Sequence, residues 1–230
     1  MTRPGAPAGS TRTGRPVTAD PRDADSLSPV QRARRDAIVR QALRLLERAE
    51  FDSIQMRDVA LRSGVALGTV YRYFASKDHL FGAVLVEWGR SFERHLAADP
   101  LHGATSVERL RDLVSRVIDA FDRRPQVLRL ISTLDTSPDE RGRQLYLEFA
   151  AMTHHIVEKP VSEFDGQRAG AVGRTLLLVL GGAFRAWGTG SLTAAEVRRG
   201  VDEAIDLIYP PGSPYVAPRP GAGTRKARAR

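Results

Sequence analysis

Apolar residues recur every three or four positions along most of the chain, which is the spacing of one buried helical face. Between residues 29 and 46, Ile38, Ala42, Leu45 and Leu46 form such a stripe, and arginines occupy the remaining faces. Strand-like alternation of apolar and polar residues is absent. The pattern predicts an all-α fold with helices from 29 to about 49, at 56–63, 67–73 and 77–98, after 105, and at 125–134, 139–158, 168–187 and 193–208.

Residues that favour helix starts support several of these boundaries. Ser28 precedes Pro29, a residue suited to the first helical turn, and Ser76 is placed to cap the helix at 77–98. Thr105-x-x-Glu108 and Thr193-x-x-Glu196 match the capping box, in which each side chain accepts a hydrogen bond from the other residue's amide.

The two ends of the chain differ from the helical part in composition. Residues 1–28 and 210–230 are rich in Pro, Gly, Arg and small polar residues and contain few large apolar ones. Such segments bury too little surface to offset the entropy of ordering, so both are predicted to be disordered. The remaining chain is divided into an N-terminal unit at 29–80 and a larger helical unit at 81–209.

The stretch at 56–77, MRDVALRSGVALGTVYRYFASK, contains two short amphipathic segments joined around Gly64. Two short helices with a glycine in the turn are typical of a helix-turn-helix motif. Gly64 can take the positive φ that ends a helix sharply, while Val59, Ala60 and Val70 are expected between the helices. In this motif the N-terminal end of the second helix enters the major groove of DNA.

The candidate DNA contacts are the polar, basic and small residues around the second helix. Gly68 permits close backbone approach, Thr69 and Arg72 can bond to base edges or phosphates, and Leu67 suits a thymine methyl group. The two tyrosines offer hydroxyls to phosphates, and Lys77 lies beside the start of the next helix. The full predicted set is Gln55, Arg57, Leu67, Gly68, Thr69, Tyr71, Arg72, Tyr73 and Lys77.

The segment MRDVALRSGVALGTVYRYFASKDHL resembles the DNA-binding segment of the TetR family of transcriptional regulators. The positions that match the family pattern are Val59, Ala60, Gly64, Val65, Gly68, Thr69, Tyr71, Tyr73, Phe74, Ser76, Lys77 and Leu80. The resemblance covers about residues 29–85. Within the family, the segment is most similar to the KstR-like group, which comprises actinobacterial repressors of steroid catabolism.

Two positions depart from the family pattern. The family usually has Ser or Thr as the N-cap of the first motif helix, where it contacts phosphate, but Gln55 stands there in this chain. Leu67 occupies a place that is commonly polar or charged, which removes one hydrogen-bonded base contact.

The charge of the chain is concentrated in the parts expected near DNA. The net charge is +8, and residues 29–80 contribute +4, residues 210–230 contribute +5, and residues 81–209 contribute −2. An excess of positive charge favours an acidic partner such as double-stranded DNA.

Several other functions lack the residues that they need. The chain has no cysteine, no phosphate-binding loop, no nucleophile elbow and no HExxH spacing, so we expect neither an enzyme nor a metal or cofactor site. The longest apolar run, at 176–184, is shorter than the roughly 20 residues of a membrane span. With no secretory signal at its start, the protein is expected to be cytoplasmic.

The second unit contains the glycine-rich apolar segment RAGAVGRTLLLVLGGAFRAW at 168–187. Small residues at helical spacing permit close packing, either inside the monomer or against another chain. The resemblance implies a homodimer in which this helix and the helix at 193–208 pair with their symmetry mates. The dimer would place two recognition helices on a pseudo-palindromic operator.

The resemblance also implies an effector pocket among the helices at about 106–187. Candidate lining residues are Phe121, Leu128, Leu134, Tyr146, Phe149, Met152 and Trp187, each of which also suits plain core packing. Since few charges fall on these faces, the expected effector is small and apolar, such as a steroid or an acyl thioester.

The sequence thus favours a sequence-specific regulator, and a repressor in particular, which an apolar effector releases from its operator. Two alternatives stay open at this stage. One is a nonspecific DNA-binding protein, which the basic tail at 210–230 supports. The other is a helical small-molecule-binding protein whose basic N-terminus is incidental.

Overall fold

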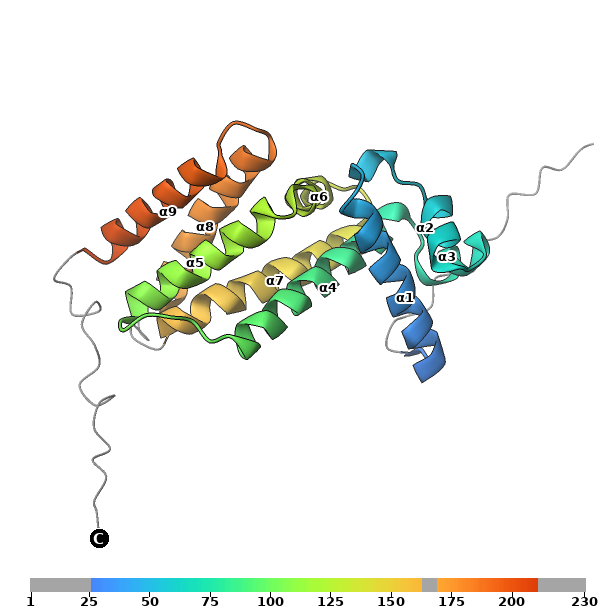
Figure 1. Ribbon diagram of the computed structural model, residues 1–230, viewed down its shortest axis with the longest axis horizontal. Coiled ribbons are helices and arrows are strands. Elements are labelled where there is room, and N and C mark those ends of the chain that lie inside the picture. The colour runs from blue at the N-terminus through green and yellow to red at the C-terminus, as the bar shows by residue number, and fades with distance from the viewer. Residues whose placement is uncertain (1–25, 163–168, 211–230) are drawn as a thin grey trace, which may run out of the picture.

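The structure is a computed structural model that describes residues 26–162 and 169–210, and its regular elements there are all helical (Figure 1). This confirms the all-α prediction. The elements are α1 (Pro29–Leu46), the short 3-10 helix η2 (Phe51–Ser53), α2 (Met56–Ser63), α3 (Leu67–Tyr73), α4 (Lys77–Ala98), α5 (Ser106–Asp122), α6 (Pro125–Asp135), α7 (Glu140–Ser162), α8 (Ala169–Gly188) and α9 (Ala194–Ile208).

The predicted capping residues begin their helices as expected. Ser28 Oγ accepts a hydrogen bond from the Gln31 amide at 3.4 Å, and Ser76 Oγ accepts one from the His79 amide at 2.9 Å. Both predicted capping boxes, at Thr105 and Thr193, are formed. The largest boundary difference is at α7, which continues to Ser162, four residues beyond the predicted end.

The ordered part of the chain begins before the predicted position. Leu27 is only 3% exposed and belongs to the core around α1, while Ser26 and Ser28 beside it are exposed. The remaining segments that were predicted to be disordered, 1–25 and 211–230, lie outside the described residues.

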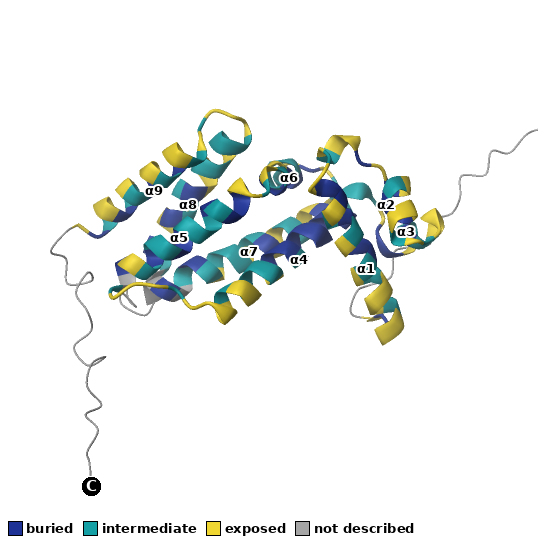
Figure 2. Cartoon of the chain, in the orientation of Figure 1, coloured by how far each residue is buried: buried dark blue, intermediate teal, exposed yellow. Residues whose placement is uncertain are grey.

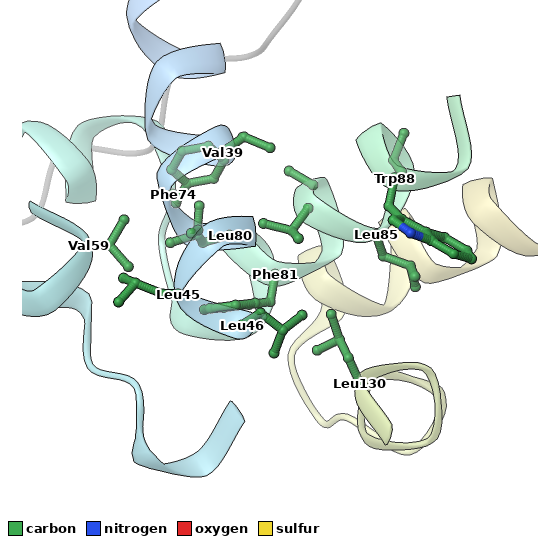
Figure 3. Close-up of a cluster of buried hydrophobic side chains, with 14 of the residues drawn as sticks. Val39, Leu45, Leu46, Val59, Phe74, Leu80, Phe81, Leu85, Trp88 and Leu130 are labelled. Atoms are coloured by element: carbon green, nitrogen blue, oxygen red, sulfur yellow. The ribbon is translucent and has the colours of Figure 1, made fainter. Parts of the chain in front are cut away.

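The buried residues form two clusters, one that extends from α1–α3 to the centre of the elongated molecule and one at the end formed by α8 and α9 (Figures 1 and 2). The first cluster joins α1–α3 to α4 and α6, and Figure 3 shows Leu46, Phe81 and Leu130 meeting where α1, α4 and α6 come together. The second cluster is made mainly by α5, α8 and α9. Because α4 runs from the first cluster into the centre of the molecule, the predicted unit boundary at 80/81 falls inside a continuous helix.

The long helices α4 and α7 lie side by side and approach closely at their N-terminal ends (Figure 1). If Gly142 of α7 carried a Cβ, that atom would lie only 2.9 Å from the Asp78 backbone carbon of α4. Ser137, in the turn before α7, donates a hydrogen bond to the Asp78 carboxylate. The start of α4 is therefore fixed against the turn between α6 and α7.

The described ranges hold neither a metal-binding cluster nor a membrane-spanning helix. No group of three or more His, Asp or Glu side chains there is arranged to hold a metal ion. None of the helices in these ranges is long and apolar enough to cross a membrane.

Candidate DNA-binding surface and effector cavity

The turn between α2 and α3 has the geometry that the sequence predicts. Gly64 ends α2 with a φ of 66°, in the left-handed region that glycine adopts without steric cost. The Val65 amide then donates to the Ala60 carbonyl at 3.1 Å. Val59 and Val70 are buried, so they hold the two helices of the helix-turn-helix against each other.

The N-terminal half of α3 presents an open surface. Leu67, Gly68 and Arg72 are exposed, and no atom would lie within 4 Å of a Cβ at Gly68. Thr69 and Tyr71 are half-buried on the same short helix. At the start of α2, Gln55 and Arg57 are exposed, and the Gln55 amide donates to Asp58 Oδ2 at 2.8 Å. Seven of the nine predicted contact residues therefore remain accessible on this helix pair.

The other two predicted contacts differ from expectation in where their side chains lie. Tyr73 is 1% exposed and belongs to the first hydrophobic cluster, because its position on α3 faces the core. We therefore leave Tyr73 out of the proposed contact surface. Lys77 Nζ lies 4.0 Å from the centre of the Phe51 ring and donates to the Asp52 carbonyl at 3.3 Å, so its ammonium points toward η2. Partial burial lowers the pKa of Lys77.

The junction between the DNA-binding helices and α4 contains a partly buried cluster of basic and aromatic side chains. The Arg35 guanidinium lies 5.0 Å from the centre of the Phe74 ring, and burial lowers the pKa of Arg35. His79 packs edge-on against Phe74, and its Nδ1 accepts a hydrogen bond from the Ala75 amide at 3.1 Å. Burial, with the nearby Arg141 and Arg35, lowers the pKa of His79 to about 4, so the imidazole is neutral near pH 7.

The second unit encloses a cavity of about 320 Å³ between α4, α5, α6, α7 and α8. This volume lies at the lower end of the range for small-molecule sites. Its walls are mostly apolar and aromatic. Helices α4 and α5 contribute the lining residues Trp88, Gly89, Phe92, Leu113, Val114, Val117 and Phe121. Helix α6 contributes Leu128, Ile131, Ser132 and Asp135. The residues from α7 include Tyr146, Phe149, Met152, Thr153 and His154, and those from α8 include Leu177, Leu180, Phe184 and Arg185.

Five of the seven predicted pocket residues line this cavity: Phe121, Leu128, Tyr146, Phe149 and Met152. Leu134 and Trp187 do not. Leu134 is fully buried in the first hydrophobic cluster, because it lies on the face of α6 that turns away from the cavity. Trp187 packs with its ring centre 6.3 Å from that of Phe184, outside the lining set.

The sequence analysis missed the contribution of α4 to the cavity. Trp88 and Phe92 lie one helical turn apart on α4, and their rings are stacked with centres 6.3 Å apart. The aromatic pair at i and i+4 was a signal for a shared face. It did not reveal that this face opens onto a cavity, since the opposite walls come from distant parts of the chain.

Three polar side chains meet at one edge of the cavity, one from each of α6, α7 and α8. Arg185 Nη2 donates to Asp135 Oδ2 at 2.6 Å, and the Tyr146 hydroxyl lies close to the same carboxylate. Partial burial and the Asp135 charge raise the pKa of Tyr146. The other polar lining groups are engaged along α7, with Thr153 Oγ1 donating to the Phe149 carbonyl at 2.9 Å and His154 lying 3.3 Å from Glu158.

Helix α6 connects the cavity with the DNA-binding helices. One face carries the four cavity residues, at 128, 131, 132 and 135, while Leu130 on the other side packs near Leu46 and Phe81 (Figure 3). Two ion pairs extend this contact to the end of α1 and the residues that follow it. Arg124 Nε lies 3.0 Å from Glu47 Oε1, and Arg129 is paired with Glu50.

Comparisons with known proteins agree with this architecture. Residues 38–84, which contain the helix-turn-helix, match the family model described as bacterial regulatory proteins, tetR family. An HTH-type transcriptional regulator of Mycobacterium bovis is 30% identical over 181 residues, which cover 76% of this chain and 88% of that protein. The chain belongs to the TetR family. This family consists of transcriptional regulators and not of enzymes.

Other TetR relatives match at different lengths. The HTH-type transcriptional repressor KstR of Mycolicibacterium smegmatis is 41% identical over 101 residues, which cover 43% of this chain and 48% of that protein. The chain thus spans about half the length of this curated relative.

Two solved structures share the TetR architecture. A TetR transcriptional regulator from Rhodococcus sp. RHA1 superposes with a TM-score of 0.65 at 25% identity, covering 77% of this chain and 96% of that one. FadR from Bacillus subtilis, solved in complex with stearoyl-CoA, superposes with a TM-score of 0.59 at 18% identity, covering 74% of this chain and 96% of that one.

Proposed function

We propose that this TetR-family chain is a homodimeric repressor that binds a pseudo-palindromic operator and leaves it when a small apolar effector enters the cavity. The observation that carries this proposal is the position of α6. The same helix lines the cavity with one face and contacts the DNA-binding helices with the other.

The proposed DNA contacts are the accessible residues on the helix-turn-helix. Arg72 and Thr69 supply hydrogen bonds to base edges or phosphates, while Leu67 and Gly68 allow the start of α3 to lie close to the bases. Gln55, Arg57 and Tyr71 are proposed phosphate contacts. Lys77 joins them if its ammonium turns away from Phe51, a movement that its partly exposed position permits.

The outer faces of α8 and α9 support the proposed homodimer. Leu178 is 78% exposed and lies one helical turn before Gly182 on α8, where an added Cβ would meet no atom within 4 Å. On α9, Leu207 is 84% exposed. Exposed leucines beside glycines allow two helices to approach closely and bury apolar surface, which is what a two-fold four-helix interface needs.

The proposed effector is small and mainly apolar because the cavity walls are. A steroid is supported by the similarity of the N-terminal part to KstR, and an acyl thioester by the shared fold with the stearoyl-CoA complex of FadR. Occupancy of the cavity would displace α6 and, through Ser137 and Asp78, the start of α4. The spacing of the two recognition helices would then no longer fit both half-sites, and such coupling is typically about 1–3 kcal/mol.

The first test is selection of bound sequences from a random duplex library at about physiological salt, where nonspecific binding is weak. We expect an inverted repeat to be recovered. The second step measures affinity for that repeat during titration with candidate steroids and acyl thioesters, and a loss of affinity is expected with at least one class.

The two steps separate the parts of the proposal. Recovery of no motif from folded protein would overturn sequence-specific regulation and favour a nonspecific DNA-binding protein. Recovery of a single half-site would overturn the dimeric arrangement. A repeat whose affinity is unchanged by cavity-filling compounds would overturn the release mechanism while leaving the DNA-binding function in place.

A further inference from the structure

The polar edge of the cavity is built by side chains from three helices that are separate in sequence. Asp135 accepts a hydrogen bond from Arg185 of α8, and burial, together with the nearby Asp135 carboxylate, raises the pKa of the Tyr146 hydroxyl of α7. The Asp135 side chain is 27% exposed and that of Arg185 is 60% exposed, so this cluster lies where the apolar cavity meets solvent. A ligand that fills the cavity with its apolar body therefore places one end against these three residues.

The charges at this edge cancel. Asp135 and Arg185 form an ion pair, and the other ionisable lining group, His154, lies near Glu158 on α7. A carboxylate placed against Arg185 would also face the Asp135 carboxylate, and like charges this close disfavour the ionised form. An ammonium would face Arg185 in the same way. An uncharged head group avoids both costs.

Resting on the proposed ligand-responsive function, we propose that the Asp135–Tyr146–Arg185 cluster selects an uncharged apolar effector that carries a hydroxyl group, which favours a hydroxylated steroid over an acyl thioester of coenzyme A. The hydroxyl donates to a free lone pair of Asp135 and accepts from an Arg185 N–H. A carboxylate has about four acceptor positions and a guanidinium has five N–H donors, so both retain capacity beyond their mutual bond.

A hydroxyl fits this cluster better than a carbonyl does. A ketone oxygen accepts from Arg185 but donates nothing to Asp135, so it uses half of the available hydrogen bonding. Hydrogen bonds to charged groups are stronger than those between neutral groups, and a site built for a hydroxyl discriminates against analogues that lack it.

The test uses three probes with the same carbon chain: 1-decanol, 2-decanone and decanoate. A Trp187→Phe protein leaves Trp88, in the cavity wall, as the single tryptophan reporter of the chain. In this background we expect the dissociation constant of 1-decanol to be lower than that of 2-decanone, and lower than that of decanoate by about tenfold or more.

The Asp135→Asn variant sharpens the test. The amide removes the negative charge and leaves Arg185 unpaired, so decanoate should bind more tightly and 1-decanol less tightly, which reverses their order. Arg185→Gln is a second variant at an exposed position. It removes the positive charge, so decanoate should bind to it even more weakly than to the parent protein. Asp202→Asn removes a carboxylate paired with Arg111 away from the cavity, and it should leave the order unchanged.

The outcomes separate this inference from the function on which it rests. If all three probes change Trp88 emission with equal affinity, or if decanoate binds best in the parent protein, the hydroxyl preference is wrong while the cavity remains a ligand site. If Asp135→Asn leaves the order of the three affinities unaltered and Arg185→Gln leaves the affinity for decanoate unchanged, the cluster does not distinguish the head groups. If no probe alters Trp88 emission or operator affinity, both the inference and the proposed effector cavity are wrong.

Discussion

The two halves of α4 pack in different surroundings. Its N-terminal half places Leu80, Phe81 and Leu85 in a fully buried cluster with α1, α3 and α6, whereas its C-terminal half places Trp88 and Phe92 on the wall of a cavity of about 320 Å³. Protein interiors are normally packed as densely as organic crystals, and an empty space costs stability. The filled core fixes α3 against α4, while the cavity leaves the other half of α4 with fewer packing contacts, which suits the proposed response to a ligand.

The largest expected contrast between these regions is in the cost of removing an aromatic ring. Phe74→Ala, in the filled core, should lower the free energy of unfolding by about 3–5 kcal/mol. Phe149→Ala, in the cavity wall, should cost less, because one side of its ring already faces empty space and has fewer contacts to lose. Urea denaturation at one fixed protein concentration measures both, since dimer dissociation makes stability depend on concentration. Equal losses would show that the two regions are packed alike.

The next prediction concerns the exposed surface that the filled core supports. Arg72→Ala should weaken operator binding by about 1–3 kcal/mol for each half-site if the guanidinium contacts a guanine. Arg94→Ala, an exposed arginine on α4 paired with Glu87, is the matched control and should leave operator affinity unchanged. Binding to the operator and to random DNA is compared in a titration. A loss on both kinds of DNA would assign Arg72 to phosphate, and no loss on either would remove it from the interface.

The geometry of the candidate DNA-binding surface was largely predictable because its residues are close in sequence. Gly64 ends α2 and Ser76 caps the start of α4, and both effects involve only the backbone of a few neighbouring residues. The residue type at each position was therefore enough to predict its role. Tyr73 is the exception. Its position within the motif suggested a surface role. However, one face of this seven-residue helix must be buried, and the Tyr73 ring lies on that face.

The cavity was harder to predict because five helices form it. Periodicity identifies the apolar residues of each helix but not which of two buried faces a residue joins. On α6, Leu128 lines the cavity while Leu134, less than two turns later, is fully buried and lies outside the cavity lining. The pairing of Asp135 with Arg185 joins residues 50 positions apart, so no local pattern could have revealed it.

A third prediction tests the junction between the two regions by changing pH. His79 has a folded-state pKa of about 4, below its ordinary value of 6.5, so the unfolded chain binds a proton that the folded chain does not. The stability that depends on neutral His79 is therefore present above about pH 6.5 and is lost as the pH falls toward 4. We expect this contribution to be about 2 kcal/mol, given that the ring is only partly buried.

The measurement compares urea denaturation between pH 7 and pH 4 for the parent protein and His79→Gln, whose amide oxygen can still accept from the Ala75 amide. The variant should lose less stability over this range, while His102→Gln, at an exposed position, should follow the parent. If parent and His79→Gln show the same slope, His79 is protonated in the folded state at a normal pKa and the junction is not closed to water.

The smallest effect on stability is expected from the ion pairs that join α6 to the DNA-binding helices, although these pairs sit where the two regions meet. Because Arg124, Arg129 and their partners are partly exposed, the double variant Arg124→Gln/Arg129→Gln should change the free energy of unfolding by about 1 kcal/mol or less. Operator affinity without effector should also stay close to that of the parent. The effector-induced loss of operator affinity, however, should shrink by about 0.5–1 kcal/mol, since α6 would move without pulling on the end of α1.

Arg90→Gln provides the matched control for this prediction, because Arg90 pairs with Glu148 at 2.9 Å and joins α4 to α7 without involving α6. Both proteins are titrated with effector in the presence of labelled operator. If the double variant responds as fully as the parent, α6 does not transmit the signal through these pairs, and the contact of Ser137 with Asp78 is the remaining route to α4. If Arg90→Gln weakens the response equally, coupling depends on surface charge in general. If only the double variant loses its response to the effector, a few exposed charges with little effect on folding determine how the region around the cavity acts on the filled core and the helix-turn-helix.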